Sequence, residues 1–529
     1  MGLYRSHGQS SDSLAKRVDP IFSDWDKTNS PGCALAVLKD GKIVYERGYG
    51  MSNLEYNIAI TPVSRFHVAS ISKQFAAAAI QRLALEGKLS LDDEVRKTIP
   101  EMPDFGHRIT FNNLIHHTSG LRDQWDLQRL AGWRDDDLIT EQDVLEMLKR
   151  QQALNFIPGE EYLYCNTGFT LLGVAVKRIT GTSLREYVDS VFFRPLGMNN
   201  TVFHSDHTEI IVGRTSAYAK DGNRWAISIP VFDTYGATSL FTTVEDLAKW
   251  DENFYTAKVG GQAFIDAMVK PGMFTNGMPQ NYASGLTLGE YHGKRTVEHA
   301  GADAGYRANF LRFPDLHLSV IVLANLADIN TARLCRRVAD LWLPYTGLIE
   351  RVTIADNTIL QQWAGDYLDP VTKAMARVEV EPGRLLFNGN VLRTVNDSVF
   401  VQSSTGANYS FREEAGKTKL LLQSEGVQNR RYEKVKKVTL SAAGLKEYEG
   451  NFYSPELETT YALVVRDSAL TVKTPRYDAF DLSPYIRDVF TGQVMLEFVR
   501  DKQKRITGFL LSTGRSRNLR FEKVGVKGL

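Results

Sequence analysis

The chain has 529 residues, a length at which about three domains of ordinary size are expected and one compact core is not. Its composition, with 43% hydrophobic, 24% charged and 10% aromatic residues, is that of a folded protein and excludes collagen-like and low-complexity architectures. With 63 Lys and Arg against 62 Asp and Glu, the net charge of +1 provides no field to attract a nucleic acid or an acidic membrane surface.

The cysteines and the apolar segments narrow the class of protein further. Cys33, Cys165 and Cys335 are few, odd in number and far apart, so neither a disulfide framework nor a thiolate metal cluster is expected. The first twenty residues lack the apolar segment of a secretory signal, and no later stretch approaches the ~18 uncharged apolar residues of a membrane span. The sequence predicts a soluble protein, with a cytoplasmic location as the expectation and a removed leader as the open alternative.

The first part of the chain, 23–346, mixes helical and strand signals. Near its start, the apolar runs 34–38 and 43–45 flank Asp40-Gly41, a dipeptide that favours a tight hairpin. This region therefore opens with antiparallel strands.

A helix and a late strand complete the expected fold of this first part. Residues 73–87 are rich in helix formers and end at a glycine, which predicts a buried helix. The apolar run 318–324 follows the strand-like stretch 310–313 and predicts a further strand. Strands near both ends with helices between them predict an α/β or α+β domain whose antiparallel sheet joins distant segments.

The last third contains an internal repeat. Residues 360–370 match 445–455 at an offset of 85, and 431–435 match 520–524 at an offset of 89. Short alternating runs with turn residues between them predict a small antiparallel β domain for each copy, where closing a barrel removes exposed strand edges.

The chain is therefore expected to be multi-domain. The predicted division is an N-terminal tail at 1–22, a catalytic domain at 23–346, and β-barrel domains at 351–438 and 439–529.

The tetrapeptide Ser70-Ile71-Ser72-Lys73 lies at the start of the predicted helix. A serine and a lysine three positions apart share one helical face, so the amine of Lys73 can reach the hydroxyl of Ser70. If burial lowers the pKa of Lys73, the neutral amine can act as the base that activates Ser70. Alone, the motif is a common chance match, because serine is also a routine helix cap.

Two motifs later in the chain supply side chains that such chemistry needs. Tyr164-Cys165-Asn166 supplies a phenol that can shuttle protons and an amide that can hold a substrate carbonyl. His299-Ala300-Gly301-Ala302 precedes a strand, and the small residues Gly301 and Ala302 would let a substrate lie along its edge.

Together these elements resemble the penicillin-recognising serine hydrolases, which include class C β-lactamases, DD-peptidases, esterases and D-aminopeptidases. The three motifs of that family are matched by Ser70/Lys73, Tyr164/Asn166 and His299/Gly301, and the stretches 114–121, 195–198 and 243–250 also look like family members. The resemblance spans about residues 20–345.

The resemblance implies a mechanism. Ser70 would attack an acyl carbonyl and form an acyl-enzyme, while Lys73 and Tyr164 share the proton transfers. The backbone N–H groups of Ser70 and Ala302 would form an oxyanion hole, and water would then release the acid.

Asn166 and His299 would position the substrate and tune the proton network. His299 stands where β-lactamases usually carry lysine, and no Ser-Asp-Asn or deacylating glutamate signature is evident. Efficient hydrolysis of β-lactams is therefore not expected. Nothing calls for a cofactor, and the adjacent His116-His117 lack the spacing of a zinc motif, so no metal is expected either.

The two β repeats make the chain most similar to bacterial D-stereospecific aminopeptidases, whose two appended domains are lipocalin-like barrels. Tyr164-Cys165-Asn166 and the stretch Ser119–Asp123 also resemble that group. In that group a loop of the last domain reaches the active site and restricts it to short substrates. The corresponding loop is expected at 473–483, around Pro475-Arg476-Tyr477-Asp478.

Several alternatives stay open at this stage. Carboxylesterase and DD-carboxypeptidase share the chemistry of a D-aminopeptidase, and a non-catalytic ligand-binding or sensor protein on the same scaffold is the alternative from another class. The expected partner is a small molecule or short peptide rather than a nucleic acid or a membrane. The repeats fit either a stability and homo-oligomerisation module or a module that shapes the substrate site.

Overall fold

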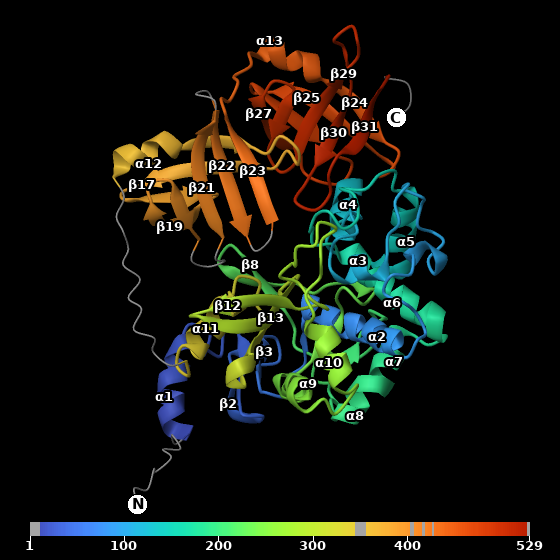
Figure 1. Cartoon of the computed structure of the whole chain (residues 1–529), viewed down its shortest axis with the longest axis vertical. Helices are drawn as coiled ribbons and strands as arrows, with labels where there is room; N and C mark the ends of the chain where they lie inside the picture. Colours follow the sequence, from blue (N-terminus) through green and yellow to red (C-terminus); the bar gives the residue numbers. More distant parts are fainter. Residues whose placement is uncertain (1–10, 344–355, 403–406, 415–417, 426–427, 526–529) are drawn as a thin grey trace, which may run out of the picture.

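The computed structural model describes residues 11–343, 356–402, 407–414, 418–425 and 428–525. Figure 1 shows a mixed helix and sheet unit below two β-barrels, with the described termini at opposite ends of the molecule. The expected domain boundary between 346 and 351 lies outside the described residues, as do the first ten residues of the expected tail. The domain limits therefore stay a prediction.

The lower unit is built on a six-stranded antiparallel sheet. In spatial order its strands are β12 (Thr287–Tyr291), β13 (Lys294–Asp303), β14 (Tyr306–Phe313), β15 (Leu318–Ala324), β1 (Cys33–Lys39) and β2 (Lys42–Tyr49). Since Cys33 lies opposite Ala324, the sheet joins distant segments and that prediction is confirmed. The hairpin between β1 and β2 turns at Asp40 and Gly41, which both have positive φ.

Helices cover both faces of this sheet, and β1 shows the two sides. Cys33, Leu35 and Val37 pack toward α1 (Ser11–Phe22) and α11 (Thr331–Ala339), whereas Ala34 and Ala36 join the apolar core of the helical region. Because both faces are covered, β1 is a continuous apolar run rather than an alternating one.

Part of the stretch assigned to an N-terminal tail is therefore structured. On α1, Val18 and Phe22 are fully buried, and the Phe22 ring stacks on Tyr49 with a centroid distance of 4.5 Å. The hydroxyl of Tyr49 donates to the carboxylate of Asp19 at 2.8 Å. The expected tail fails for this segment because its apolar residues recur on one helical face and cover the sheet.

The helical region surrounds α2 (Lys73–Leu85), which confirms the predicted helix. The run Ala76–Ala79 is fully buried, and its small side chains allow α6 (Asn166–Thr180) to pack closely beside it. The remaining helices of this region are α3 (Phe111–Ile115), α4 (Gln124–Ala131), α5 (Glu141–Arg150), α7 (Leu184–Val188), α8 (Arg194–Leu196), α9 (Val244–Thr256) and α10 (Gln262–Val269).

Both C-terminal repeats form closed eight-stranded antiparallel barrels. The first consists of β16 (Gly365–Leu368), β17 (Met375–Glu381), β18 (Arg384–Phe387), β19 (Asn390–Asn396), β20 (Val399–Val401), β21 (Asn408–Glu414), β22 (Thr418–Glu425) and β23 (Gln428–Val435). The second consists of β24 (Gly450–Ser454), β25 (Thr459–Arg466), β26 (Ala469–Lys473), β27 (Phe480–Ile486), β28 (Val489–Thr491), β29 (Met495–Arg500), β30 (Ile506–Ser512) and β31 (Leu519–Val524).

The repeat explains the glycine at the first position of each barrel. Gly365 and Gly450 stand 85 residues apart and have φ values of 144° and 147°. A Cβ there would lie 2.6 Å and 2.7 Å from the Cε atoms of Lys434 and Lys523, which belong to the closing strands. The same backbone geometry thus closes both barrels.

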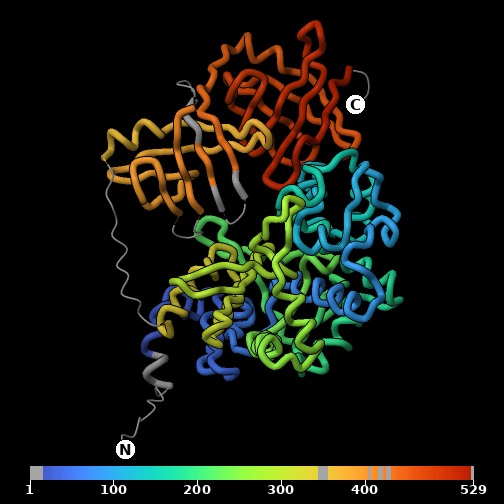
Figure 2. Tube along the Cα trace, viewed as in Figure 1, coloured from blue at the N-terminus to red at the C-terminus, as the bar shows by residue number. Residues whose placement is uncertain are grey.

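The second barrel packs directly on the helical region, as Figure 2 shows where the red trace meets the light-blue one. Leu127 and Leu130 of α4 and Met147 of α5 belong to the apolar cluster of this barrel. The Tyr461 hydroxyl donates to the Leu130 carbonyl at 2.8 Å. In the part of the chain that the structure describes, every helix is too short or too polar to span a bilayer.

Candidate active site

Ser70 lies on the 3₁₀ turn η1 (Ala69–Ser72), which leads directly into α2. The preceding residue, Ala69, has a φ of +47°, a left-handed conformation that a non-glycine residue rarely adopts. Ser70 is partly exposed, whereas its neighbours Ala69 and Ile71 are buried. The turn thus presents the hydroxyl of one serine to solvent.

Lys73 is fully buried beneath this turn, and its amine has three oxygen partners. Its Nζ lies 2.8 Å from the Asn166 Oδ1, 2.7 Å from the Ala237 carbonyl and 3.1 Å from the Ser70 Oγ. A neutral amine has two N–H donors and one lone pair. If the two N–H groups bind Asn166 and Ala237, the lone pair faces Ser70.

The surroundings of Lys73 favour that neutral form. Burial lowers the pKa of Lys73 to about 7, because the charged ammonium is poorly solvated there. The negative charges of Asp123 and Asp303 raise the pKa in opposition, and the positive charge of Arg515 lowers it. A large fraction of the molecules therefore holds a free amine near neutral pH.

Tyr164 lies on the loop before α6, beside this amine. Its ring centroid is 4.9 Å from the Lys73 Nζ and 6.2 Å from the His299 ring. Burial raises the pKa of Tyr164, and hydrogen bonding with Ser70 lowers it. The phenol is thus protonated at neutral pH and lies next to the serine.

His299 stands on β13, and its Nε2 lies 2.9 Å from the hydroxyl of Tyr282. Burial and, to a smaller extent, the nearby charge of Lys73 lower the pKa of His299 to about 3. The imidazole is neutral at physiological pH, so it can hydrogen bond but cannot supply the positive charge of a lysine in this place.

Asn166 is the first residue of α6, and an aspartate holds both of its donors. The Asp123 Oδ2 accepts from the Asn166 backbone N at 2.7 Å and from the Nδ2 at 2.8 Å. The side-chain amide thereby points its oxygen at Lys73.

The edge of β13 that faces Ser70 is open. β12 pairs with β13 only as far as Glu298, so from His299 to Asp303 β13 has, among the described strands, a partner on the β14 side alone. At Gly301 a Cβ would lie 2.2 Å from the Val68 carbonyl oxygen, which explains why a glycine is needed where β13 crosses η1. The exposed Ala302 follows at the mouth of the site.

A cavity of about 660 Å³ brings the expected site residues together. Ser70, Tyr164, Asn166, His299, Gly301 and Ala302 all line it, and Lys73 lies below it. Asp303 and Arg515 also line this cavity. Asp328 and Arg307 line it as well, so a substrate in this space would meet two carboxylates and two guanidiniums besides the serine.

The structure corrects the loop that was expected to reach the site. The Tyr477 hydroxyl donates to the Trp133 carbonyl and Arg476 pairs with Asp137 at 3.4 Å, so this loop lies on the segment after α4. The residue of the second barrel that lines the Ser70 cavity is Arg515, on the loop between β30 and β31. The expected loop lies away from the cavity because its side chains have their partners in the segment after α4.

Sequence reasoning did not identify five groups that shape the site. They are Asp123, Ala237, Tyr282, Asp303 and Arg515. Asp123 ends the stretch Ser119–Asp123, which resembles the aminopeptidases, and this was the available signal for it. The others carry no motif. Cys165 is buried and its pKa is raised to about 12, as expected of an inert packed thiol.

Comparisons with known proteins agree with this geometry. The sequence pattern of the beta-lactamase family matches residues 18–341. A D-aminopeptidase of Brucella anthropi is 25% identical over 517 residues, covering 93% of this chain and 95% of that protein. A D-aminopeptidase of Gluconobacter oxydans is 28% identical over 380 residues, 70% of each chain. The octameric penicillin-binding protein homologue from Pyrococcus abyssi shares the fold, with a TM-score of 0.57 and 20% identity over 89% of this chain and all of that one.

Replacing Gly301 with alanine tests the close crossing of β13 and η1. We expect Gly301→Ala to lower the rate of covalent labelling by a fluorophosphonate about 100-fold or more, because the displaced strand would move the Ala302 N–H, the expected oxyanion donor, away from Ser70. Gly289→Ala on β12, where the nearest atom is a side-chain oxygen at 3.1 Å, is the matched control and should label normally. Equal labelling of both variants would contradict this role of Gly301.

Proposed function

This serine hydrolase belongs to the beta-lactamase family, and we propose that it is a D-aminopeptidase that forms an acyl-enzyme at Ser70. The observation that carries the proposal is the buried amine of Lys73, whose contacts with Asn166 and Ala237 leave its lone pair for Ser70. The two D-aminopeptidases support the substrate class.

In the first step, the Ser70 Oγ attacks the carbonyl carbon of the substrate and its proton passes to the Lys73 amine. The carbonyl oxygen becomes an oxyanion, stabilised by the backbone N–H groups of Ser70 and Ala302. The C–N bond then breaks, and the leaving amine takes a proton from Tyr164, which Lys73 reprotonates. The acyl group stays on Ser70.

In the second step, a water molecule attacks the ester carbonyl of the acyl-enzyme. Tyr164 and Lys73 accept its proton and return one to the Ser70 Oγ, so the acid leaves and the resting state is restored. Asn166 and the neutral His299 hold the substrate and the proton network in place through the whole cycle.

Asp303 supports a substrate with a free amine. It lines the Ser70 cavity next to Ala302, and one of its carboxylate oxygens accepts from Thr238. Burial raises the pKa of Asp303 to about 6, so the carboxylate is ionised at neutral pH. A substrate ammonium can pair with it beside the oxyanion hole.

Arg515 favours DD-carboxypeptidase activity as the second candidate. Its guanidinium carbon lies 4.9 Å from the ring centroid of Tyr164, the group proposed to protonate the leaving amine. A cation there suits the terminal carboxylate of a leaving D-residue.

The direct test of the proposed function is the removal of the nucleophile. We expect a fluorophosphonate to form one adduct on Ser70 and Ser70→Ala to lose both the adduct and turnover of a D-aminoacyl anilide. Ser72→Ala, which removes a neighbouring hydroxyl that accepts from the Leu240 N–H, should still be labelled. Turnover retained by Ser70→Ala would exclude the mechanism, and absence of any adduct in the wild type would favour a binding or sensor protein.

The pH dependence tests the base. Since a protonated Lys73 cannot accept the serine proton and its pKa is lowered to about 7, kcat/KM should fall about tenfold per pH unit below that value. The substrate should be a short ester without an amine, so that ionisation of Asp303 does not enter the profile. If kcat/KM instead falls only near pH 3, the titrating group is His299 rather than Lys73.

Charge removal at Asp303 tests the substrate class. We expect Asp303→Asn to raise KM for a D-aminoacyl anilide roughly tenfold or more and to change a short ester less than threefold, because only the first carries an ammonium. Asp328→Asn, at an exposed position of the same cavity, is the matched control. If only esters are hydrolysed, or if acyl-D-Ala-D-Ala is preferred over the anilide, the D-aminopeptidase reading fails.

A further inference from the structure

A buried carboxylate lies directly behind the amide of Asn166. Asp123 is fully buried at the position before α4, and its Oδ1 accepts from the Trp125 N–H at 3.1 Å. Its Oδ2 accepts from both the backbone N and the Nδ2 of Asn166. Every described hydrogen-bond donor to this carboxylate is thus an amide.

The carboxylate decides which way the Asn166 amide points. With the Nδ2 on Asp123, the Oδ1 faces the Lys73 Nζ at 2.8 Å. A flipped amide would place its oxygen against the carboxylate, which is repulsive, and its N–H₂ against the amine, which would draw the lone pair of Lys73 away from Ser70. One orientation therefore satisfies all three groups.

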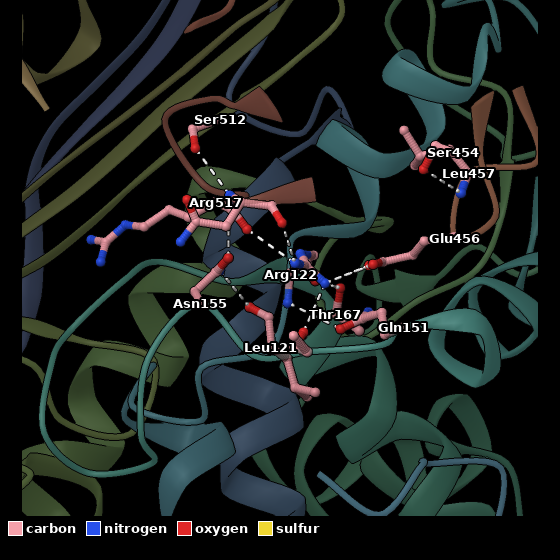
Figure 3. Close-up of polar contacts among 12 residues, drawn as sticks. Leu121, Arg122, Gln151, Asn155, Thr167, Ser454, Glu456, Leu457, Ser512 and Arg517 are labelled. Atoms are coloured by element: carbon pink, nitrogen blue, oxygen red, sulfur yellow. Dashed lines mark hydrogen bonds and ion pairs between the residues drawn. The ribbon is translucent and has the colours of Figure 1, made fainter. Parts of the chain in front are cut away.

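The residue before Asp123, Arg122, is bound to the second barrel. The Arg122 guanidinium pairs with Glu456 of the β24–β25 turn at 2.6 Å, with side chains only 1% and 4% exposed. It also donates to the carbonyls of Ala153 at 2.7 Å and Arg517 at 3.0 Å. Figure 3 shows Arg122 between Glu456 and Arg517 of the barrel.

The backbone of Arg122, in contrast to its side chain, contacts the helix that carries the active-site residue Asn166. Its carbonyl accepts from the Thr167 hydroxyl at 2.7 Å, on the first turn of α6 beside Asn166. Asn155 adds a second link, because its Nδ2 donates to the carbonyls of Leu121 and Arg515 at 3.2 Å and 3.0 Å. The segment before α4 is thus held from the barrel on one side and from α6 on the other.

We propose that Asp123 is a positioning residue that keeps the Asn166 amide oxygen on Lys73, and that the Arg122–Glu456 ion pair makes this orientation depend on the docked second barrel. The inference deepens the proposed function, since it rests on Lys73 as the base. Asp123 does not line the Ser70 cavity and acts through Asn166 and through its charge on Lys73.

Several titratable and charged groups face Lys73 from the elements around it. They are Asp123 before α4, Tyr164 and Cys165 before α6, Asp303 and His299 on β13, His117 after α3, and Arg515 from the barrel loop. Of these, Asp123 makes the largest contribution that raises the pKa of Lys73. Its loss lowers that pKa further, and the amine then stays neutral at lower pH.

The first experiment replaces Asp123 with asparagine in the full-length protein. We expect kcat for a short ester to fall about 30-fold or more with KM changed less than threefold, because the amide of Asn166 loses its fixed orientation. The acid limb of the kcat/KM profile should move to lower pH. A purely structural role would lower stability without moving that limb.

Asp251→Asn is the matched control for this change. Asp251 is a fully buried carboxylate in the same unit, paired with Arg312 at 2.7 Å and away from the Ser70 cavity. It should lower the melting temperature but leave the acid limb in place. If Asp123→Asn keeps the wild-type limb and kcat, the positioning role is wrong. If Asp123→Asn does not fold, Asp123→Glu decides: a folded variant with the wild-type kcat and limb overturns the role, and a lowered kcat supports it.

The second experiment tests the link to the barrel. Glu456→Gln should lower kcat about tenfold, because the buried Arg122 loses its charged partner and the segment before α4 shifts. Glu458→Gln is the matched control two residues away, where an exposed pair with Arg150 at 3.2 Å also joins the barrel to α5. Equal kcat values for the two variants would overturn the dependence on barrel docking.

The double variant Arg122→Met/Glu456→Met separates charge from packing, since it leaves no buried ion unpaired. We expect a folded protein with a lowered kcat, and a wild-type kcat would overturn the link. Fluorophosphonate labelling of wild-type Ser70 distinguishes the two levels of inference. If the wild type is not labelled, the proposed function fails; if it is labelled and the variants are unaffected, only this inference fails.

Discussion

The amine of Lys73, buried among the oxygens of Ser70, Asn166 and Ala237, is the constraint on which the rest of the site depends. Burying an ammonium ion is unfavourable unless charges and hydrogen bonds compensate for the lost water. Here the compensation is incomplete, so the pKa of the amine falls to about 7. A residue that is an acid at the surface thereby becomes a base next to a serine.

The scaffold meets this constraint by bringing three distant parts of the chain to one point. The turn η1 carries Ser70, the start of α6 carries Asn166, and β13 closes the site from the sheet. The crossing of β13 over η1 leaves no room for a side chain at Gly301. Because β12 ends its pairing at Glu298, the same stretch of β13 also presents an open edge to a substrate.

The two barrels share a fold but not a position. Each begins at a glycine with a positive φ angle, Gly365 in the first barrel and Gly450 in the second, next to a lysine of the closing strand. Only the second shares its apolar cluster with Leu127, Leu130 and Met147 of the helical region among the described residues, and it supplies both Glu456 and Arg515. Duplication of a sequence thus gave two similar domains with different surroundings.

The sequence by itself determined the elements whose signals are local: the hairpin at Asp40-Gly41, the helix from Lys73, the strand 318–324 and the repeat that became two barrels. Its motifs also predicted Ser70, Lys73, Tyr164, Asn166 and His299 as neighbours, and the structure places them around one cavity. Only the tertiary structure decided that Asp123, Asp303 and Arg515 join them, that α1 covers the sheet, and that the loop at 473–483 lies beside α4. A motif is a pattern of residues a few positions apart and can be found in the sequence. The burial and charge of a site and the docking of a domain depend on contacts between side chains that are hundreds of residues apart in the sequence.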